Sequence, residues 1–401
     1  MASALLVLFV VLAIAGAFAS GVRIGQSRAH HAGAPDDARP AMPMLRAATS
    51  VAFEPIAQRG CRGLALADHA SEWRAAMASV GTRLRKADVG AVVFVHGTFT
   101  GSDPLSAVQL VERVLPPRAA APVAGALRRV TRAAVERVLG DLGHFSAGYT
   151  DLFEHAVNDT DDAAVHPIAC TTFAWSSENH HLGRVEAALG LLRVLATHHE
   201  IGGGGRVLVL GHSHAGQIFA LVTQMIASVL TAETVRDVAR VRRLDVTSYD
   251  VDRLTLARAP IDFVTFGSPV RYAWAETGHT RALHVVSGGD WVQRIGGASS
   301  DFPPFHVEDR RANAALEASL GASFEPSSAL RALWTPPPLE ARNVVLVDYG
   351  DAALLDRIGT GLGHGGYTRL DAMLFHADLV TRMLYESTTE PLAPGTNGIS
   401  A

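Results

Sequence analysis

The chain has few of the features that indicate a disulfide scaffold, a cysteine-rich metal site or a polyelectrolyte partner. Its 401 residues include only two cysteines, Cys61 and Cys170, which excludes a disulfide framework and a metal site built from cysteines. The two could form one disulfide in an exported protein or remain buried thiols, and both alternatives stay open. The formal net charge of −4 gives no electrostatic reason to expect nucleic acid as a partner.

Motifs for phosphate and metal binding are missing as well. Gly202–Gly205 precedes a strand-like apolar run instead of following one, and no G-x-x-x-x-G-K-[ST] pattern occurs. The 18 histidines include the pairs His180-His181 and His198-His199, which flank a helical segment and are expected to be solvated. No H-E-x-x-H motif accompanies them. The sequence therefore predicts neither a cofactor nor a metal.

The chain begins with an apolar segment. Ala4–Ala19 carries no charge and ends in Ala-Phe-Ala, a pattern typical of a secretory signal with its cleavage site. No Lys or Arg precedes it, and it is just long enough to span a bilayer if retained. Residues 1–20 are thus predicted to be a signal peptide or membrane anchor, with a cytoplasmic protein as the alternative. Residues 21–50, rich in Ala, Arg, His and Pro, are predicted to form a flexible linker.

The most informative stretch is Arg206–Gly216. Val207–Leu210 has the composition of a strand buried on both faces, and Gln217–Leu230 is apolar and free of Pro and Gly, which favours a helix. Gly-His-Ser-His-Ala-Gly between them puts Ser213 at the apex of a tight turn, the context of a G-x-S-x-G nucleophile elbow. Ala215 replaces the second glycine and adds only a Cβ, so we expect this variant to be tolerated. A serine that only caps the helix is the alternative.

Residues 51–401 are predicted to form one α/β domain, because apolar runs of strand length alternate with helical segments. The expected strands are Ala91–Val95, Pro167–Trp175, Val207–Leu210, Asp262–Phe266, Arg281–Ser287 and Val344–Val347. The expected helices are Leu64–Leu84, Leu182–His199, Gln217–Leu230 and Leu370–Tyr385. This alternation predicts a mostly parallel sheet with helices on both faces and active residues at the carboxyl ends of its strands.

Two segments interrupt the alternation. Residues 103–166 are predicted to be a helical insertion, with helices at Leu105–Leu115 and Ala124–Leu139 and a polar, irregular part at His144–Asp162. Its position suggests a lid over the site, and a solvated decoration is the alternative. Thr231–Arg258 is charged and variable in pattern, and we expect a second excursion over the surface.

The strand Ala91–Val95 ends in His96-Gly97-Thr98. Ester hydrolysis develops negative charge on the carbonyl oxygen of the substrate, and preorganised backbone N–H groups stabilise that charge. We assign the N–H groups of Thr98 and of His214, the residue after the candidate nucleophile, as the two oxyanion-hole donors. A plain glycine turn with His96 packed beneath it is the alternative.

A serine nucleophile needs a base and an acid, which follow it in the order Asp/Glu, His in this fold class. Asp290 comes directly after a strand in a turn next to glycines and is the predicted acid. Asp348 ends the last strand and is its main rival, Asp301 lies in a long loop and is weaker, and Asp262 begins its strand and so lies at the wrong edge.

His364 follows the last strand on a glycine-rich loop and is the predicted base. His306 comes before that strand, which is too early in the chain. His376 falls inside the closing helix, where a packed core histidine is expected.

With Ser213, Asp290 and His364 in this order, the chain resembles the α/β-hydrolase superfamily, and in particular its lipase-like serine esterases. The similar segments are the elbow, Phe94-Val95-His96-Gly97-Thr98, Phe266-Gly267-Ser268-Pro269 and Gly289-Asp290-Trp291-Val292. The resemblance implies cofactor-free hydrolysis of a small-molecule or lipid ester through an acyl-enzyme on Ser213. An amidase or thioesterase with the same triad, or a non-catalytic binding protein with this fold, are the alternatives.

Overall fold

The computed structural model describes residues 49–52, 71–97, 145–177, 181–230, 232–242, 244–268, 272, 274–275, 277–287, 290, 344–349 and 364–386. The predicted signal or anchor at residues 1–20 lies outside the described residues, as do Cys61, Thr98, Asp301 and His306. Within the described ranges, no helix is both long and apolar enough to cross a membrane. Among the same residues, Cys170 is a free, half-buried thiol.

In the part of the chain that the structure describes, seven strands form one sheet in the order β1-β7-β6-β5-β4-β2-β3, and every neighbouring pair is parallel. The strands are β1 (Thr49–Ala52), β2 (Val89–Val95), β3 (Ala169–Phe173), β4 (Arg206–His212), β5 (Ile261–Phe266), β6 (Arg281–Ser287) and β7 (Val344–Asp348). The predicted α/β class with a parallel sheet is therefore confirmed, and all six predicted strands are present. β1 was not predicted: Thr49 and Ser50, assigned to the linker, pair in register with Val345 and Leu346 of β7.

The central strands are apolar on both sides, as their composition predicted. In β4, Val207 and Val209 pack into one hydrophobic cluster, while Leu208 and Leu210 pack into a second cluster on the opposite face. Successive side chains of a strand point to opposite faces, so a continuous apolar run is what a strand covered on both faces requires.

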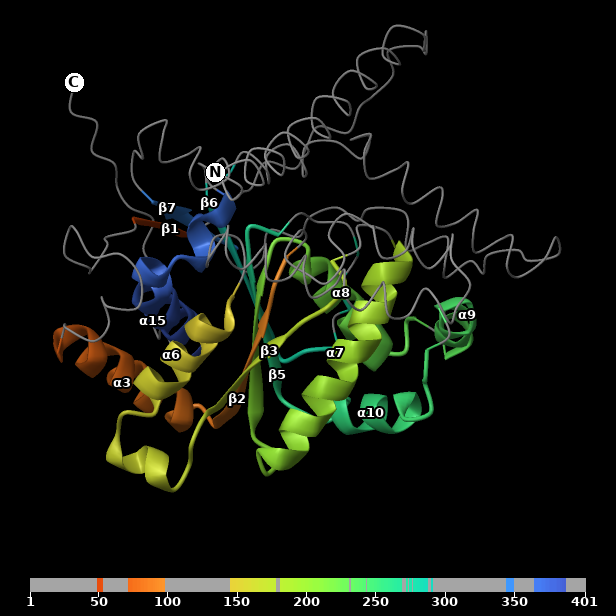
Figure 1. Cartoon of the computed structure of the whole chain (residues 1–401), viewed down its shortest axis with the longest axis horizontal. Helices are drawn as coiled ribbons and strands as arrows, with labels where there is room; N and C mark the ends of the chain where they lie inside the picture. The colour runs from red at the N-terminus through yellow and green to blue at the C-terminus, as the bar shows by residue number, and fades with distance from the viewer. Residues whose placement is uncertain are drawn as a thin grey trace, which may run out of the picture.

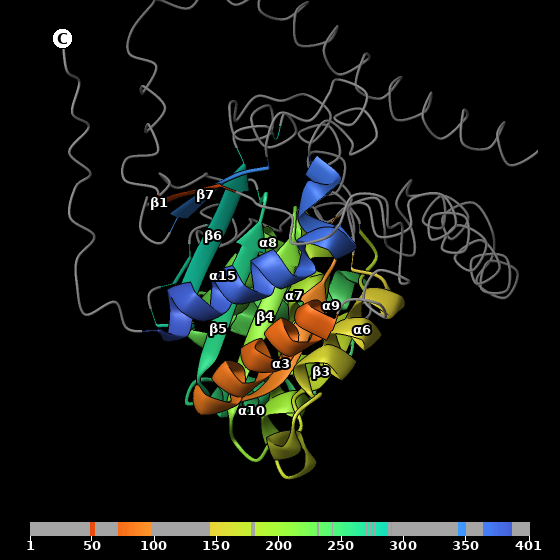
Figure 2. The ribbon, with the colours of Figure 1, turned by 90° about the vertical axis from the view of Figure 1, so that its left-hand side faces the viewer.

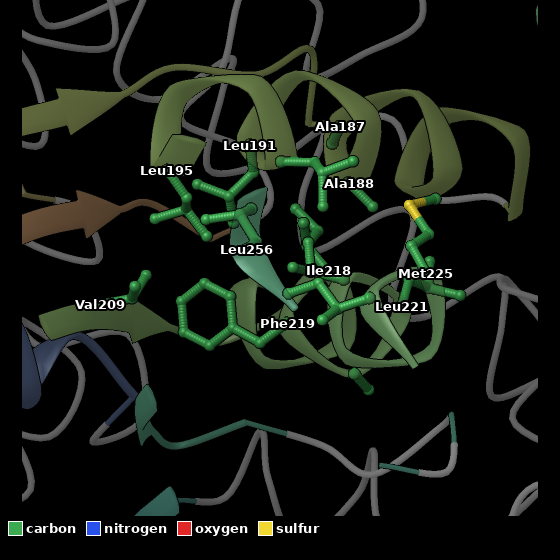
Figure 3. Close-up of a cluster of buried hydrophobic side chains, with 14 of the residues drawn as sticks. Ala187, Ala188, Leu191, Leu195, Val209, Ile218, Phe219, Leu221, Met225 and Leu256 are labelled. Carbon is green, nitrogen blue, oxygen red and sulfur yellow. The ribbon is translucent and has the colours of Figure 1, made fainter. Parts of the chain in front are cut away.

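Among the described residues, four helices lie on one side of the sheet: α7 (His181–Ile201), α8 (Ala215–Ile226), α9 (Ala232–Arg242) and α10 (Tyr249–Leu256) (Figure 1). Figure 3 shows Leu191 and Leu195 of α7 against Ile218 and Phe219 of α8. The segment Thr231–Arg258, expected as an excursion over the surface, contains α9 and α10, which pack against the core. Apolar residues lie among its charged ones, and Val235, Val238 and Leu256 are buried in the same hydrophobic cluster as the residues of α7 and α8.

The other face carries α3 (Ser71–Lys86), α6 (Ala147–Val157) and α15 (Met373–Tyr385) (Figure 2). The segment His144–Asp162 was expected to be irregular, and this expectation is wrong for Ala147–Val157, which forms the helix α6. Tyr149 and Phe153 of this helix pack on Phe94 of β2 with ring centroids 5.6 and 5.2 Å apart. The end of the predicted insertion is thus part of the helical layer, while residues 103–144 lie outside the described residues. Short 3-10 helices are η1 (Asp161–Ala164), η2 (His364–Thr368) and η3 (Leu370–Ala372).

Candidate active site

The strand order reverses between β2 and β4. From β2 the chain passes to β3 on one side, then returns to β4 on the other side and continues outward through β5, β6 and β7. Ligands of open parallel sheets bind in the crevice outside the carboxyl ends of the strands at such a switch point. Gly97 follows β2 and Ser213 follows β4, so the candidate nucleophile lies at this crevice.

Ser213 occupies the tight turn between β4 and α8. Its backbone has a φ of +54°, a left-handed conformation that costs a non-glycine residue free energy. The Ser213 N–H donates to the carbonyl of Phe266 at 2.8 Å, which ties the turn to the end of β5. The residue is buried, with 7 % of its surface exposed. The turn is therefore strained and held in place, as a nucleophile elbow requires.

Glycines let the backbone segments around Ser213 approach one another. A Cβ on Gly97 would lie 2.7 Å from the Ser213 Cβ, and a Cβ on Gly216 would lie 2.6 Å from Ser268. A Cβ on Gly211 would lie 2.8 Å from the Cβ of Ala215. Because Gly211 has no side chain, the Cβ of Ala215 fits at the fifth position of the motif.

The structure brings Asp290 and His364 together. His364 Nδ1 lies 2.8 Å from Asp290 Oδ2, the carboxylate is fully buried, and the imidazole is 14 % exposed. An ionised carboxylate only accepts hydrogen bonds, so Nδ1 carries the proton and Nε2 is left as an acceptor. His364 Nε2 is buried and has no hydrogen-bond partner within the described part of the chain. An imidazole in this state can accept a proton from an alcohol.

His212 connects the candidate base to the elbow. Its Nε2 donates to the backbone carbonyl of His364 at 2.8 Å, and the two rings lie 4.6 Å apart between centroids. Because His212 directly precedes Ser213, this bond holds η2 against the turn that carries the serine. Sequence reasoning missed this role, since one histidine among 18 gave no signal for a bond to a distant carbonyl.

The predicted oxyanion donors are placed only in part. Thr98 lies outside the described residues, whereas His214 is the N-cap of α8. N–H groups at the start of a helix have no acceptor within it, and the helix dipole there favours negative charge. The backbone at His214 therefore lies at the positive end of the α8 dipole.

His96 is buried beneath the turn that follows β2. Its Nε2 accepts the backbone N–H of Trp175 at 3.1 Å. The ring proton is therefore on Nδ1, which lies 2.8 Å from the carbonyl oxygen of Gly97. The Ser177 hydroxyl donates to the same carbonyl at 3.0 Å. These bonds join the ends of β2 and β3 and fix the last described residue before Thr98.

The rival residues fare differently. Asp262 lies at the amino end of β5, at the opposite edge as expected. Asp348 ends β7 beside Ala52 of β1. His376 is packed in α15 with its Nε2 2.8 Å from the Tyr349 hydroxyl, and burial lowers its pKa to about 3.

His198 and His199, which were expected to be solvated, are half-buried near the end of α7 and therefore only partly solvated. The Nδ1 atom of His199 lies 3.0 Å from the carbonyl of Gly205. His181 belongs to α7, and His180 lies outside the described residues.

No group of three or more His, Cys, Asp or Glu side chains with metal-binding geometry occurs in the described ranges. Comparisons of the chain with protein-family models, with curated proteins and with solved structures find no match.

Proposed function

We propose that this chain is a serine hydrolase of the α/β-hydrolase type that cleaves carboxylic esters with Ser213, His364 and Asp290. The observation that carries the proposal is the 2.8 Å bond between His364 Nδ1 and the fully buried Asp290 carboxylate. This bond leaves the buried Nε2 without a partner among the described residues. Ser213, on the neighbouring strained elbow, is the hydroxyl that such a base would activate, although it is not hydrogen-bonded to Nε2 in this structure.

In the proposed reaction, His364 Nε2 removes the Ser213 hydroxyl proton as the oxygen attacks the ester carbonyl. The charge on the resulting imidazolium is balanced by Asp290, and the N–H groups of His214 and Thr98 stabilise the oxyanion. The protonated imidazole then gives its proton to the leaving alcohol, which departs and leaves an ester on Ser213. Water activated by the same base attacks this acyl-enzyme, and Ser213 regains its proton as the acid is released.

A fluorophosphonate probe tests the nucleophile directly. The probe phosphonylates a serine only where a base activates it, so we expect wild-type protein to be labelled and Ser213→Ala to remain unlabelled. Ser228→Ala is the matched control, because Ser228 is exposed and also has a positive φ, +59°. Equal labelling of Ser213→Ala and wild type would remove Ser213 from the proposal.

Substrate class is tested with a matched series that shares one acyl group. A nitrophenyl ester, the corresponding anilide and the corresponding thioester differ only in the leaving group, so their kcat/KM values separate an esterase from an amidase or thioesterase. We expect the ester to be cleaved best. Lengthening the acyl chain within the ester series then separates a small-ester enzyme from one that acts on lipid esters.

A further inference from the structure

A second hydrogen-bond donor reaches the carboxylate oxygen that binds His364. The Tyr367 hydroxyl donates to Asp290 Oδ2 at 3.1 Å, while His364 Nδ1 lies 2.8 Å from the same atom. The phenol oxygen also accepts the Ser287 N–H, at the end of β6, at 2.8 Å. Because a phenol has one proton and the backbone N–H takes a lone pair of the oxygen, that proton is directed at Asp290.

The spacing of the two donors follows from the 3-10 helix that carries them. His364 and Tyr367 are three residues apart in η2, and side chains at i and i+3 of a 3-10 helix eclipse one another. One turn therefore presents an imidazole and a phenol to a single carboxylate oxygen. Gly267 makes room for this arrangement, since a Cβ there would lie 2.5 Å from the Tyr367 ring and 2.8 Å from Asp290 Oδ2.

The Tyr367 hydroxyl keeps its proton at every pH at which such an enzyme works. The side chain is fully buried, and burial together with the Asp290 charge raises the pKa of Tyr367 well above its usual value of 10. Two further titratable groups face this cluster. His212 comes from β4, and Tyr349, after β7, stacks edge-on against Tyr367 at 5.5 Å and is bonded to His376 of α15.

We infer that Tyr367 is a positioning residue that sets the strength of the bond between Asp290 and His364. This inference rests on the proposed function. Two donors share the electron density of one oxygen, so the hydroxyl of Tyr367 fixes the place of Oδ2 and takes up part of its charge. Without that hydroxyl, Oδ2 loses one of the donors that compete with His364 and stabilises the charged imidazole more strongly. The base would then stay protonated, and hence inactive, up to a higher pH.

The test compares two substitutions that each remove one buried hydroxyl. In Tyr367→Phe, we expect the midpoint of the acidic limb of the kcat/KM–pH profile to rise by roughly half a pH unit or more. At the wild-type optimum, kcat should fall about 3- to 10-fold with KM within about twofold. Tyr349→Phe is the matched control, because its hydroxyl bonds to His376 instead of Asp290, and its midpoint should equal that of wild type.

A second measurement does not depend on activity. The proton on His364 Nδ1 should give a downfield NMR signal, assigned by its loss in His364→Gln, that moves further downfield in Tyr367→Phe and stays in place in Tyr349→Phe. If Tyr367→Phe does not fold, replacing the six tyrosines with 3-fluorotyrosine keeps the ring and makes the phenol a stronger donor. The signal should then move upfield instead.

The outcomes separate the two proposals. A folded Tyr367→Phe protein with an unmoved pH midpoint and an unmoved proton signal would overturn the role of Tyr367. In the fluorotyrosine protein, an unmoved signal would have the same meaning. A wild-type protein that is neither labelled by the probe nor able to cleave esters would instead overturn the proposed hydrolase, even where the proton signal responds as expected.

Discussion

Arg206 Nη1 lies 3.0 Å from both carboxylate oxygens of Asp262, where β4 and β5 begin. Asp262 is fully buried and also accepts the Tyr385 hydroxyl at 2.9 Å, while Arg281 lies 3.6 Å away. This cluster is at the amino edge of the sheet, and the candidate active site is at the carboxyl edge. The two edges thus hold two buried carboxylates, one joined to arginines and one to a histidine.

The Asp262 cluster is predicted to contribute to stability and not to catalysis. Burial raises the pKa of Asp262 above its ordinary value although both arginines oppose this. Removing the carboxylate would nevertheless leave Arg206, which is only 15 % exposed, without its ion-pair partner. Asp262→Asn should lower the free energy of unfolding by about 3 kcal/mol in urea titrations, with ester turnover of the folded protein unchanged.

Asp378 provides the comparison for this measurement. It also has two arginine partners, Arg83 and Arg382, each at 2.7 Å, but its side chain is 32 % exposed. Asp378→Asn should therefore cost no more than about 1 kcal/mol. Equal losses in the two variants would contradict the importance of burial.

The backbone strain at Ser213 predicts that two inactive variants of this residue differ in stability. A glycine at φ +54° has no Cβ to clash. The free energy of unfolding of Ser213→Gly should therefore be about 1 kcal/mol larger than that of Ser213→Ala. Both variants lack the hydroxyl and should be inactive. Thermal unfolding of the two proteins checks this difference, and an alanine variant as stable as the glycine variant would mean that the turn carries no strain.

Gly97 is predicted to be essential for the geometry of the site. A Cβ there would lie 2.7 Å from the Ser213 Cβ, so Gly97→Ala must displace the serine, and a shift of about 1 Å can cost roughly 100-fold in rate. We expect that loss in kcat for a nitrophenyl ester. Gly90 lies near the amino end of β2, where a Cβ would meet the Gly202 carbonyl oxygen at an ordinary 3.4 Å, so Gly90→Ala should keep the wild-type rate.

One buried and one half-buried histidine, His376 and His284, predict that stability declines on acidification. Burial lowers the pKa of His284 to about 4 and that of His376 to about 3, whereas the unfolded chain binds these protons near pH 6.5. Between those pH values the unfolded state holds more protons, so the stabilisation is complete above pH 6.5 and is lost as the pH falls. From pH 7 to pH 5 the two sites together should reduce the free energy of unfolding by about 3 kcal/mol.

Urea titrations across this pH range on three variants check the assignment. The double variant His284→Gln/His376→Gln should show a shallower decline than wild type. His166→Gln, which changes an exposed histidine, should decline in parallel with wild type. A double variant with the wild-type slope would show that other groups control the acid sensitivity.

Most of the sheet could be predicted from the sequence because its strands are buried on both faces. Runs such as Val207–Leu210 leave little alternative for a segment bounded by glycines. β1 could not be found in this way, since Thr49–Ala52 is short and half polar, and only its pairing with β7 makes it a strand. Likewise, the charged residues of α9 suggest a solvated segment, although its buried valines pack against the core.

The candidate site likewise contains residues that the sequence predicted and contacts that it did not. Strand ends and chain order selected Ser213, Asp290 and His364, because parallel strands bring their carboxyl ends to one edge. Those signals are local. The bonds from His212 and Tyr367 depend on how distant segments pack, and a His-x-x-Tyr spacing has meaning only once the turn is known to be a 3-10 helix.

The bond between His212 and the carbonyl of His364 joins positions 152 residues apart. At roughly 5–20 residues per second, a ribosome takes on the order of ten seconds to cover that distance. During this interval a nascent chain would already have the serine turn but not yet the imidazole. The proposed hydrolase would therefore be inert throughout its own synthesis and become competent only when the segment from residue 364 onward emerges and docks.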